Sequence, residues 1–390
     1  MTRLVPFAYG FRPFFLAAGW FALAGIGAWL WLYRAGLAPF GGLPAFQWHA
    51  HEMLYGFVAA AIAGFMLTAV PSWTGERGFA GRPLVVLTCL WLAGRVAIAA
   101  AGVLPLPAVA IAELAFLPAL AATIAPSLLR SSNRNAPLLI VLFVLWGLDA
   151  TFLYALADRD VLLAGTALRA ALDVVLLLVT IIGGRIVPAF TANALRRRGV
   201  PVRVRAHRVV EAWAIVSMAV LVFADLVAPT HGVTAGIALT AALAHAVRMS
   251  GWQTLTTWRE PIVWVLHAAY LWLPIGLLLK AAWLLTGAPW AAHWPHALGA
   301  GAAATMIMAV MTRAALGHTG RPLVAAKPIA WAYGLLVLAA AVRVFGPSLL
   351  PVSYAHVITC AAVLWLAAFG LYAWVYTPIL LGPRADGKPG

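Results

Sequence analysis

Histidine side chains lie at the start of two long apolar segments of this sequence. His49 and His51 precede an apolar run that ends at Val70, and His296 precedes a second run that ends at Leu316. Neutral imidazole is a common ligand of haem iron, copper and zinc. These residue types predict a metal or haem centre, although a histidine inside a helix bundle often serves only to hydrogen-bond a neighbouring helix.

The two histidine segments resemble each other, which predicts an internal repeat. The letters WHAHEM, which include His51, correspond to WPH, which ends at His296, and both copies lead to Gly-Arg-Pro-Leu. The interval from His51 to Gly75 equals the interval from His296 to Gly320. We therefore expect His51 and His296 at the same depth, near the outer surface, on helices that run in parallel.

Helical geometry limits what the first pair of histidines can do together. At about 100° per residue, His49 shares a helix face with Gly56 and Gly64, whereas His51 points to nearly the opposite side. The pair therefore cannot chelate one metal ion from a regular helix. Either the segment before Glu52 is not helical, or the two histidines have different partners. The small residues on the His49 face could allow close helix packing or could accept a porphyrin.

Composition places these residues in a membrane. Hydrophobic residues make up 64% of the 390 positions and charged residues 9%, so a water-soluble fold could not cover its apolar surface. Apolar runs of about 20 residues match a hydrocarbon core about 30 Å thick. We expect an all-α polytopic protein with about twelve transmembrane helices in a single membrane domain. The predicted spans are residues 14–33, 50–71, 83–101, 106–129, 136–157, 162–188, 209–228, 231–249, 261–285, 295–316, 328–346 and 353–380.

Basic residues are distributed unevenly among the predicted loops. The formal charge of +15 comes from side chains in short loops, so it indicates membrane orientation and no nucleic-acid partner. Most of these residues lie on the same side as the segment 196–208, whereas the opposite loops hold little beyond Arg34 and Arg159. This asymmetry predicts that both termini are cytoplasmic. The basic linker 196–208 divides the chain into six helices in residues 1–195 and six in residues 209–390.

The predicted topology sorts the histidines by depth. A layer near the outer surface is the candidate metal or haem site, and a pair nearer the inner surface is a second candidate. His207 and His318 fall at or beyond the inner boundary and have no expected ligand role. The outer layer consists of His49, His51, His231, His293, His296 and His356, and the inner pair is His245 and His267.

Charged residues inside the apolar spans are costly and suggest function. They are Arg95, Glu113, Asp149, Arg169, Asp173, Asp225 and Arg343. Arg95, Arg169 and Arg343 could bind haem propionates, and the carboxylates could carry protons, or the opposite charges could simply neutralise one another. The letters GGRIVPAFT at residues 183–191 predict a broken helix end on the cytoplasmic side.

Several motifs together resemble those of the NnrS family, and the resemblance runs from the first predicted helix to the last. It implies a twelve-helix protein of the bacterial inner membrane that contains haem, of the b type, and copper. It also implies a role in the response to nitric oxide and nitrosative stress, with ligand roles for His49, His51 and His296. The motifs are GFRPFF at 10–15, WHAHEM at 48–53, GRIVPAFT at 184–191, MTR at 311–313 and GHTGR at 317–321.

The leading hypothesis is a membrane protein that binds nitric oxide or converts it at a histidine-ligated metal centre, supplied by an electron donor. No catalytic residue is assigned. A secondary transporter or metal-handling permease is an alternative, because six plus six helices with buried charges are also typical of transporters. A third is a membrane assembly or sensor protein that carries haem as a reporter.

Overall fold

Twelve helical spans are long and apolar enough to cross a membrane in the part of the chain that the structure describes. The structure is a computed structural model, and it describes residues 5–37 and 44–388. These residues form helices and loops without any strand. Each predicted apolar run has a helical counterpart, which confirms the all-α polytopic fold. The chain is a multi-pass membrane protein.

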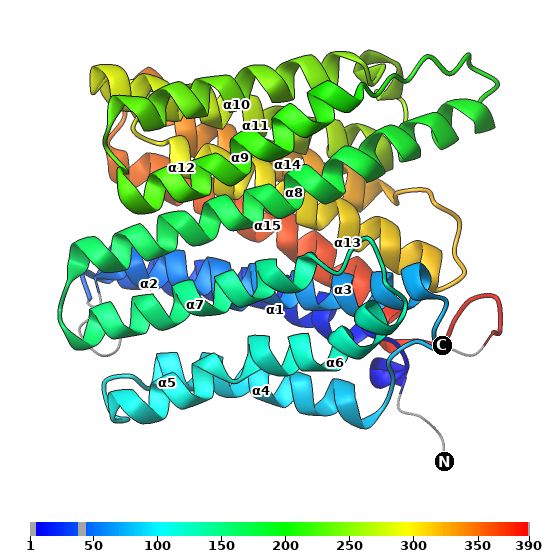
Figure 1. Ribbon diagram of the computed structural model, residues 1–390, viewed down its shortest axis with the longest axis horizontal. Coiled ribbons are helices and arrows are strands. Elements are labelled where there is room, and N and C mark those ends of the chain that lie inside the picture. The colour runs from blue at the N-terminus through cyan, green and yellow to red at the C-terminus, as the bar shows by residue number, and fades with distance from the viewer. Residues whose placement is uncertain (1–4, 38–43, 389–390) are drawn as a thin grey trace. The chain divides into compact units, whose positions relative to one another are not determined.

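Several of the spans are interrupted or irregular helices. The second span joins an α-helix, a π-helix and another α-helix, and the tenth is built in the same way. The elements, shown in Figure 1, are η1 (Val5–Phe7), α1 (Phe11–Ala35), α2 (Ala45–His51), η3 (Glu52–Val58), α3 (Ala59–Thr74), α4 (Arg82–Ala99), α5 (Leu106–Leu114), α6 (Phe116–Arg130), α7 (Leu138–Ala157), α8 (Val161–Arg197), α9 (Arg208–Val227), α10 (Gly232–Ser250), η4 (Thr254–Thr257), α11 (Pro261–Thr286), η5 (Pro289–Ala291), α12 (Trp294–His296), η6 (Ala297–Ala304), α13 (Thr305–His318), α14 (Lys327–Leu349) and α15 (Tyr354–Leu381).

The helix α8 is longer than the sequence indicates. We expected a broken helix end at residues 183–191, and this prediction was wrong because α8 continues unbroken to Arg197. Gly184 lies inside the helix, and a Cβ atom there would overlap the guanidinium group of Arg248 on α10. The glycine therefore permits a close approach between two helices and does not end one.

The helices divide into two compact units. Unit 1 consists of Met1–Ala171, Ala314–Pro322 and Phe369–Gly390, and unit 2 of Leu172–Arg313 and Leu323–Ala368. In unit 1, α1 packs on α3 and η3, α4 packs on α5, and α6 lies against α3 and α7. In unit 2, α10 contacts α9 and α11, and η6 contacts α11 and α14.

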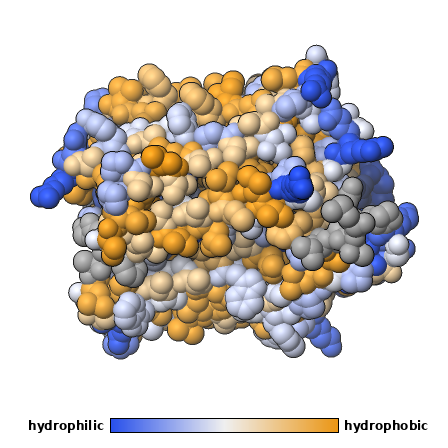
Figure 2. Space-filling model, turned by 90° about the horizontal axis from the view of Figure 1, so that it is seen from below, coloured by the Kyte–Doolittle hydropathy of each residue, from blue (hydrophilic) through white to orange (hydrophobic). Residues whose placement is uncertain are grey.

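Large apolar side chains remain exposed along these helices. Ile111 is 76% exposed, Phe143 67% and Trp374 69%. Figure 2 shows hydrophobic residues across the middle of one face and the most hydrophilic residues towards its two ends. Apolar surface of this extent is stable in contact with lipid and not with water. The lipid bilayer is therefore the surrounding that these helices require.

Candidate metal centre

Five ionisable side chains meet in the interior of unit 1. His51 ends α2, Glu52 begins η3, Arg95 lies on α4, Glu113 on α5 and Asp149 on α7. Each of them is at most 7% exposed. Four different spans therefore supply one buried polar cluster, which we call the His51 cluster.

A break in the fourth span positions Glu113. The helix α5 ends at Leu114 and α6 begins at Phe116. Pro118 has no N–H group, so it cannot donate to the carbonyl of Leu114 four residues earlier. Instead, the indole Nε1 of Trp146 on α7 donates to this carbonyl at 3.1 Å. The break therefore occurs at Ala115, two residues after Glu113, at a point that α7 stabilises.

The π-helix η3 positions Glu52 and the residues that follow it. A π-helix leaves part of the backbone out of the regular ladder, and such segments occur often at functional sites. The carbonyl of Gly56 accepts a hydrogen bond from Nε1 of Trp91 on α4 at 3.0 Å. The hydroxyl of Tyr55 donates to the carbonyl of Leu145 on α7 at 3.0 Å. These bonds connect η3 to the helices that carry Arg95 and Asp149.

Carboxylates flank both ring nitrogens of His51. Its Nδ1 lies 3.0 Å from Oε1 of Glu52, and its Nε2 lies 3.0 Å from Oδ1 of Asp149 and 3.8 Å from Oε1 of Glu113. Arg95 forms buried ion pairs with both Glu52 and Glu113. The guanidinium therefore holds together two carboxylates that would otherwise repel each other.

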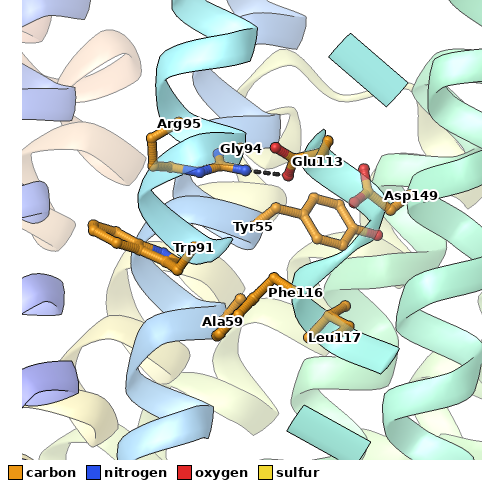
Figure 3. A pocket seen from close by; sticks show the side chains of 9 residues that line it. All are labelled: Tyr55, Ala59, Trp91, Gly94, Arg95, Glu113, Phe116, Leu117 and Asp149. Atoms are coloured by element: carbon orange, nitrogen blue, oxygen red, sulfur yellow. Dashed lines mark hydrogen bonds and ion pairs between the residues drawn. The ribbon is translucent and has the colours of Figure 1, made fainter. Parts of the chain in front are cut away.

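A small cavity of about 10 Å³ adjoins the cluster, with room for about one water molecule. Figure 3 shows Tyr55, Glu113 and Asp149 grouped around it. Glu113 Oε2 is buried and has no hydrogen-bond partner. A Cβ atom on Gly94 would lie only 2.5 Å from this oxygen, so the glycine provides its space. The cavity lining consists of Tyr55, Ala59, Trp91, Gly94, Arg95, Glu113, Phe116, Leu117 and Asp149.

The donor atoms and charges of this cluster suit a metal ion. One nitrogen of His51 and one oxygen each from Glu113 and Asp149 all lie within 4.8 Å of one another. Three carboxylates and one guanidinium leave two surplus negative charges when the imidazole is neutral. Uncompensated charge is costly in an apolar interior. A divalent cation would balance it, and so would protonation of His51 together with one carboxyl group.

A porphyrin does not fit at this cluster. The cavity is ion-sized, and the small-residue face that follows His49 is already covered by aromatic rings from α1. A Cβ atom on Gly56 would overlap the ring of Phe21, and one on Gly64 would lie 2.6 Å from the ring of Phe15. Of the two uses we considered for this face, the structure shows helix packing.

The structure separates the two histidines of α2. Both lie in regular α-helix, so they have different partners. The ring of His49 lies 4.7 Å from that of Trp29, whereas the ring of His51 stacks on Phe152 at 4.7 Å. His51 reaches the carboxylates of the cluster. The remaining outer-layer histidines, His231, His293, His296 and His356, all belong to unit 2 and are exposed or half-buried.

His231 and His356 have hydrogen-bond partners close to them in the sequence. Nδ1 of His231 accepts the backbone N–H of Val233 at 3.2 Å and caps α10. Nδ1 of His356 lies 2.6 Å from the hydroxyl of Ser353. His296 directly precedes η6. Among the described residues, His51, Glu113 and Asp149 are the one group of histidine, cysteine or carboxylate side chains close enough together to bind a metal ion.

The inner pair of histidines is buried among hydroxyl groups. Nδ1 of His245 lies 2.7 Å from the hydroxyl of Tyr270. The two ring nitrogens of His267 lie 2.7 Å from Thr191 and 3.0 Å from Thr254. Each ring is thus hydrogen-bonded within unit 2, an arrangement that packing alone explains.

The three arginines considered for haem propionates have different surroundings. Arg95 belongs to the His51 cluster. Arg169 donates to the hydroxyl of Thr166 on its own helix at 3.0 Å. Arg343 lies 3.1 Å from Nδ1 of His293 and donates to the hydroxyl of Tyr354 at 2.9 Å.

Sequence reasoning did not assign the carboxylates of the cluster as ligands. Glu113 and Asp149 stood out as buried charges, but nothing in the spacing showed that they face His51. The signal available was that three neighbouring spans each carry a charged residue in the half that the predicted topology places towards the outer surface. That signal indicates that the charged residues lie at a similar depth in the membrane, but it does not show that their side chains touch.

A family model described as NnrS protein matches residues 5–384, which is nearly the whole chain. The match includes every residue of the His51 cluster. The comparison with curated proteins found no match.

Proposed function

This chain belongs to the NnrS family of nitric oxide response membrane proteins, and we propose that it binds a metal ion at His51, Glu113 and Asp149. The observation that carries the proposal is the convergence of one imidazole and two carboxylates, all nearly excluded from solvent, beside an ion-sized cavity. The unpartnered Oε2 of Glu113 supports the same conclusion, because metal coordination satisfies a buried oxygen.

Copper is the ion that the family resemblance implies, and Cu(II) accepts nitrogen and oxygen donors. The bound ion would supply a Lewis-acid or redox centre for nitric oxide, with electrons from a donor protein. Glu52 would orient the His51 ring through Nδ1, leaving Nε2 for the ion. Arg95 would hold Glu113 and limit the surplus negative charge.

Haem is a separate proposal, since the His51 cluster does not admit a porphyrin. Its axial ligand would come from the remaining histidines of the outer layer, and Arg169 or Arg343 would bind its propionates. His49 and His296 are the candidates that the resemblance favours. We place the protein in the bacterial cytoplasmic membrane with both termini in the cytoplasm, as the basic loops predict.

Charge balance favours a second candidate function, a proton-handling transporter. Protons on His51 and one carboxyl group would neutralise the cluster as well as a metal ion would. Metal analysis distinguishes the two functions, because a proton site purifies without a stoichiometric ion.

The test is the copper content of the protein purified in detergent and loaded with copper. We expect about one ion per chain at this site, which is lost in His51→Ala, Glu113→Gln and Asp149→Asn. His207→Ala is the matched control, because His207 is exposed and lies outside the spans. Unchanged copper content in all three folded cluster variants would refute the metal site.

A further inference from the structure

Three charged side chains meet in the interior of unit 2. Asp173 on α8, Asp225 on α9 and Lys280 on α11 are each only 1% exposed. Nζ of Lys280 lies 3.3 Å from Oδ2 of Asp173 and forms an ion pair with Oδ2 of Asp225. The same ammonium lies 4.6 Å from the ring centroid of Trp294. None of these residues belongs to the His51 cluster.

The charges of this triad do not balance when all three groups are ionised. Two carboxylates face one ammonium, so one negative charge remains in an apolar interior. The charged side chains that act on Asp173 are Lys280 and Asp225. The aromatic face of Trp294 attracts the ammonium but cannot compensate a carboxylate. The triad therefore requires one more positive charge.

An unpartnered atom shows where that charge belongs. Oδ1 of Asp173 is buried and has no hydrogen-bond donor. The carboxyl groups of Asp173 and Asp225 contact the same ammonium of Lys280, so they lie close to each other. Two ionised carboxylates repel each other at this range, whereas a protonated carboxyl donates to its neighbour. One proton would thus remove both the surplus charge and the missing hydrogen bond.

We propose that Asp173, Asp225 and Lys280 form a proton-binding site, in which the two carboxyl groups share one proton beside a fixed ammonium. The site can accept and release a proton in the interior of unit 2. The proposal rests on contacts within unit 2 alone and does not depend on the metal site at the His51 cluster. There are two alternatives. A monovalent cation such as Na⁺ would balance the same charge, or the triad would be fully ionised, would only join helices, and would bind neither a proton nor Na⁺.

The number of protonated carboxyl groups tests the proposal directly. Infrared spectra of the purified protein in H₂O and D₂O resolve the carboxylic acid C=O band, which shifts on deuteration. Relative to wild type, Asp173→Asn and Asp225→Asn should each lose one acid group, because lysine and the remaining carboxylate then balance. Lys280→Met should gain one, because both carboxyl groups must be protonated when the ammonium is absent.

Asp386→Asn is the matched control. Its hydrogen bond with Arg384 lowers the pKa of Asp386 to about 2, so this carboxyl group is ionised at neutral pH. The control should lose a carboxylate band and leave the acid band unchanged. Size-exclusion profiles and circular dichroism establish that each variant is folded.

A second measurement decides the question if Asp173→Asn or Asp225→Asn does not fold. Asp149→Asn protein labelled with ¹³C at the aspartate carboxyl groups retains Asp173 and Asp225 as its buried aspartates among the described residues. The proposal requires an isotope-shifted acid band in this protein. An acid band that is absent, or that appears only when Na⁺ is removed, would overturn it.

Discussion

Replacement of Arg95 by glutamine should destabilise unit 1 strongly in metal-free protein. Arg95 is 7% exposed and pairs with Glu52 and Glu113, which are 3% and 5% exposed. The variant leaves these carboxylates buried without a cation. Breaking a buried ion pair by removing one partner costs about 3–5 kcal/mol, and we expect a loss of this size in the free energy of unfolding.

The same variant should respond more strongly to metal than wild type does. A divalent ion replaces the lost positive charge, and a ligand present at about 100 times its dissociation constant adds about 2.7 kcal/mol. Arg95→Gln combined with Glu113→Gln should recover part of the loss without metal, because one uncompensated carboxylate is removed.

The assay is reversible unfolding in mixed micelles, followed by tryptophan fluorescence with and without copper. Arg384→Gln is the control, because it breaks an exposed pair with Asp386 and such pairs contribute little. The reasoning fails if metal-free Arg95→Gln is as stable as the control. It also fails if copper stabilises Arg95→Gln no more than wild type.

Three further outcomes are expected. Gly94→Ala places a Cβ 2.5 Å from Glu113 Oε2, so the affinity of the folded protein for copper should fall about 10- to 100-fold. Copper titration measures this affinity, and an affinity equal to that of wild type would contradict the site. The hydrogen bond from Arg384 lowers the pKa of Asp386 from 3.8 to about 2. The stabilisation of the C-terminal tail by the Arg384–Asp386 pair is therefore complete above pH 3.8 and lost as the pH falls through about 2. Amide exchange at Ala385 should show this loss in wild type and not in Arg384→Gln. Reporter fusions should place both termini and the segment 196–208 in the cytoplasm, and an external terminus would reject the predicted topology.

The spans could be predicted from sequence because the thickness of the lipid core sets the length of an apolar helix. The packing inside them could not. The letters of residues 183–191 were taken as the sign of a helix end, since the sequence does not reveal that the Arg248 side chain occupies the space beside Gly184. Hydropathy indicates one span over residues 106–129. It does not show that the helix breaks beside Glu113, where Pro118 cannot donate to the Leu114 carbonyl and Trp146 on α7 donates to it instead.

The candidate site was predictable in part for a similar reason. Helical periodicity left two alternatives for His49 and His51, a non-helical segment or different partners, and the regular helix α2 decides for different partners. Periodicity could not identify Glu113 and Asp149 as the partners of His51, because contacts between spans depend on how each helix is rotated about its axis. Both histidine segments are followed by a π-helix, η3 after His51 and η6 after His296, which is a local likeness consistent with the suspected repeat. Their equal depth stays a prediction.

The π-helix η3 makes the His51 cluster sensitive to chain length. A π-helical turn holds an additional residue relative to an α-helical one. Deletion of a single residue between Glu52 and Val58 would let the span close as ordinary α-helix, with little loss of backbone hydrogen bonding. Everything before the deletion would then turn by about 100° and shift by about 1.5 Å along the axis, which carries His51 away from Asp149. A one-residue deletion could therefore abolish the site while the membrane span survives.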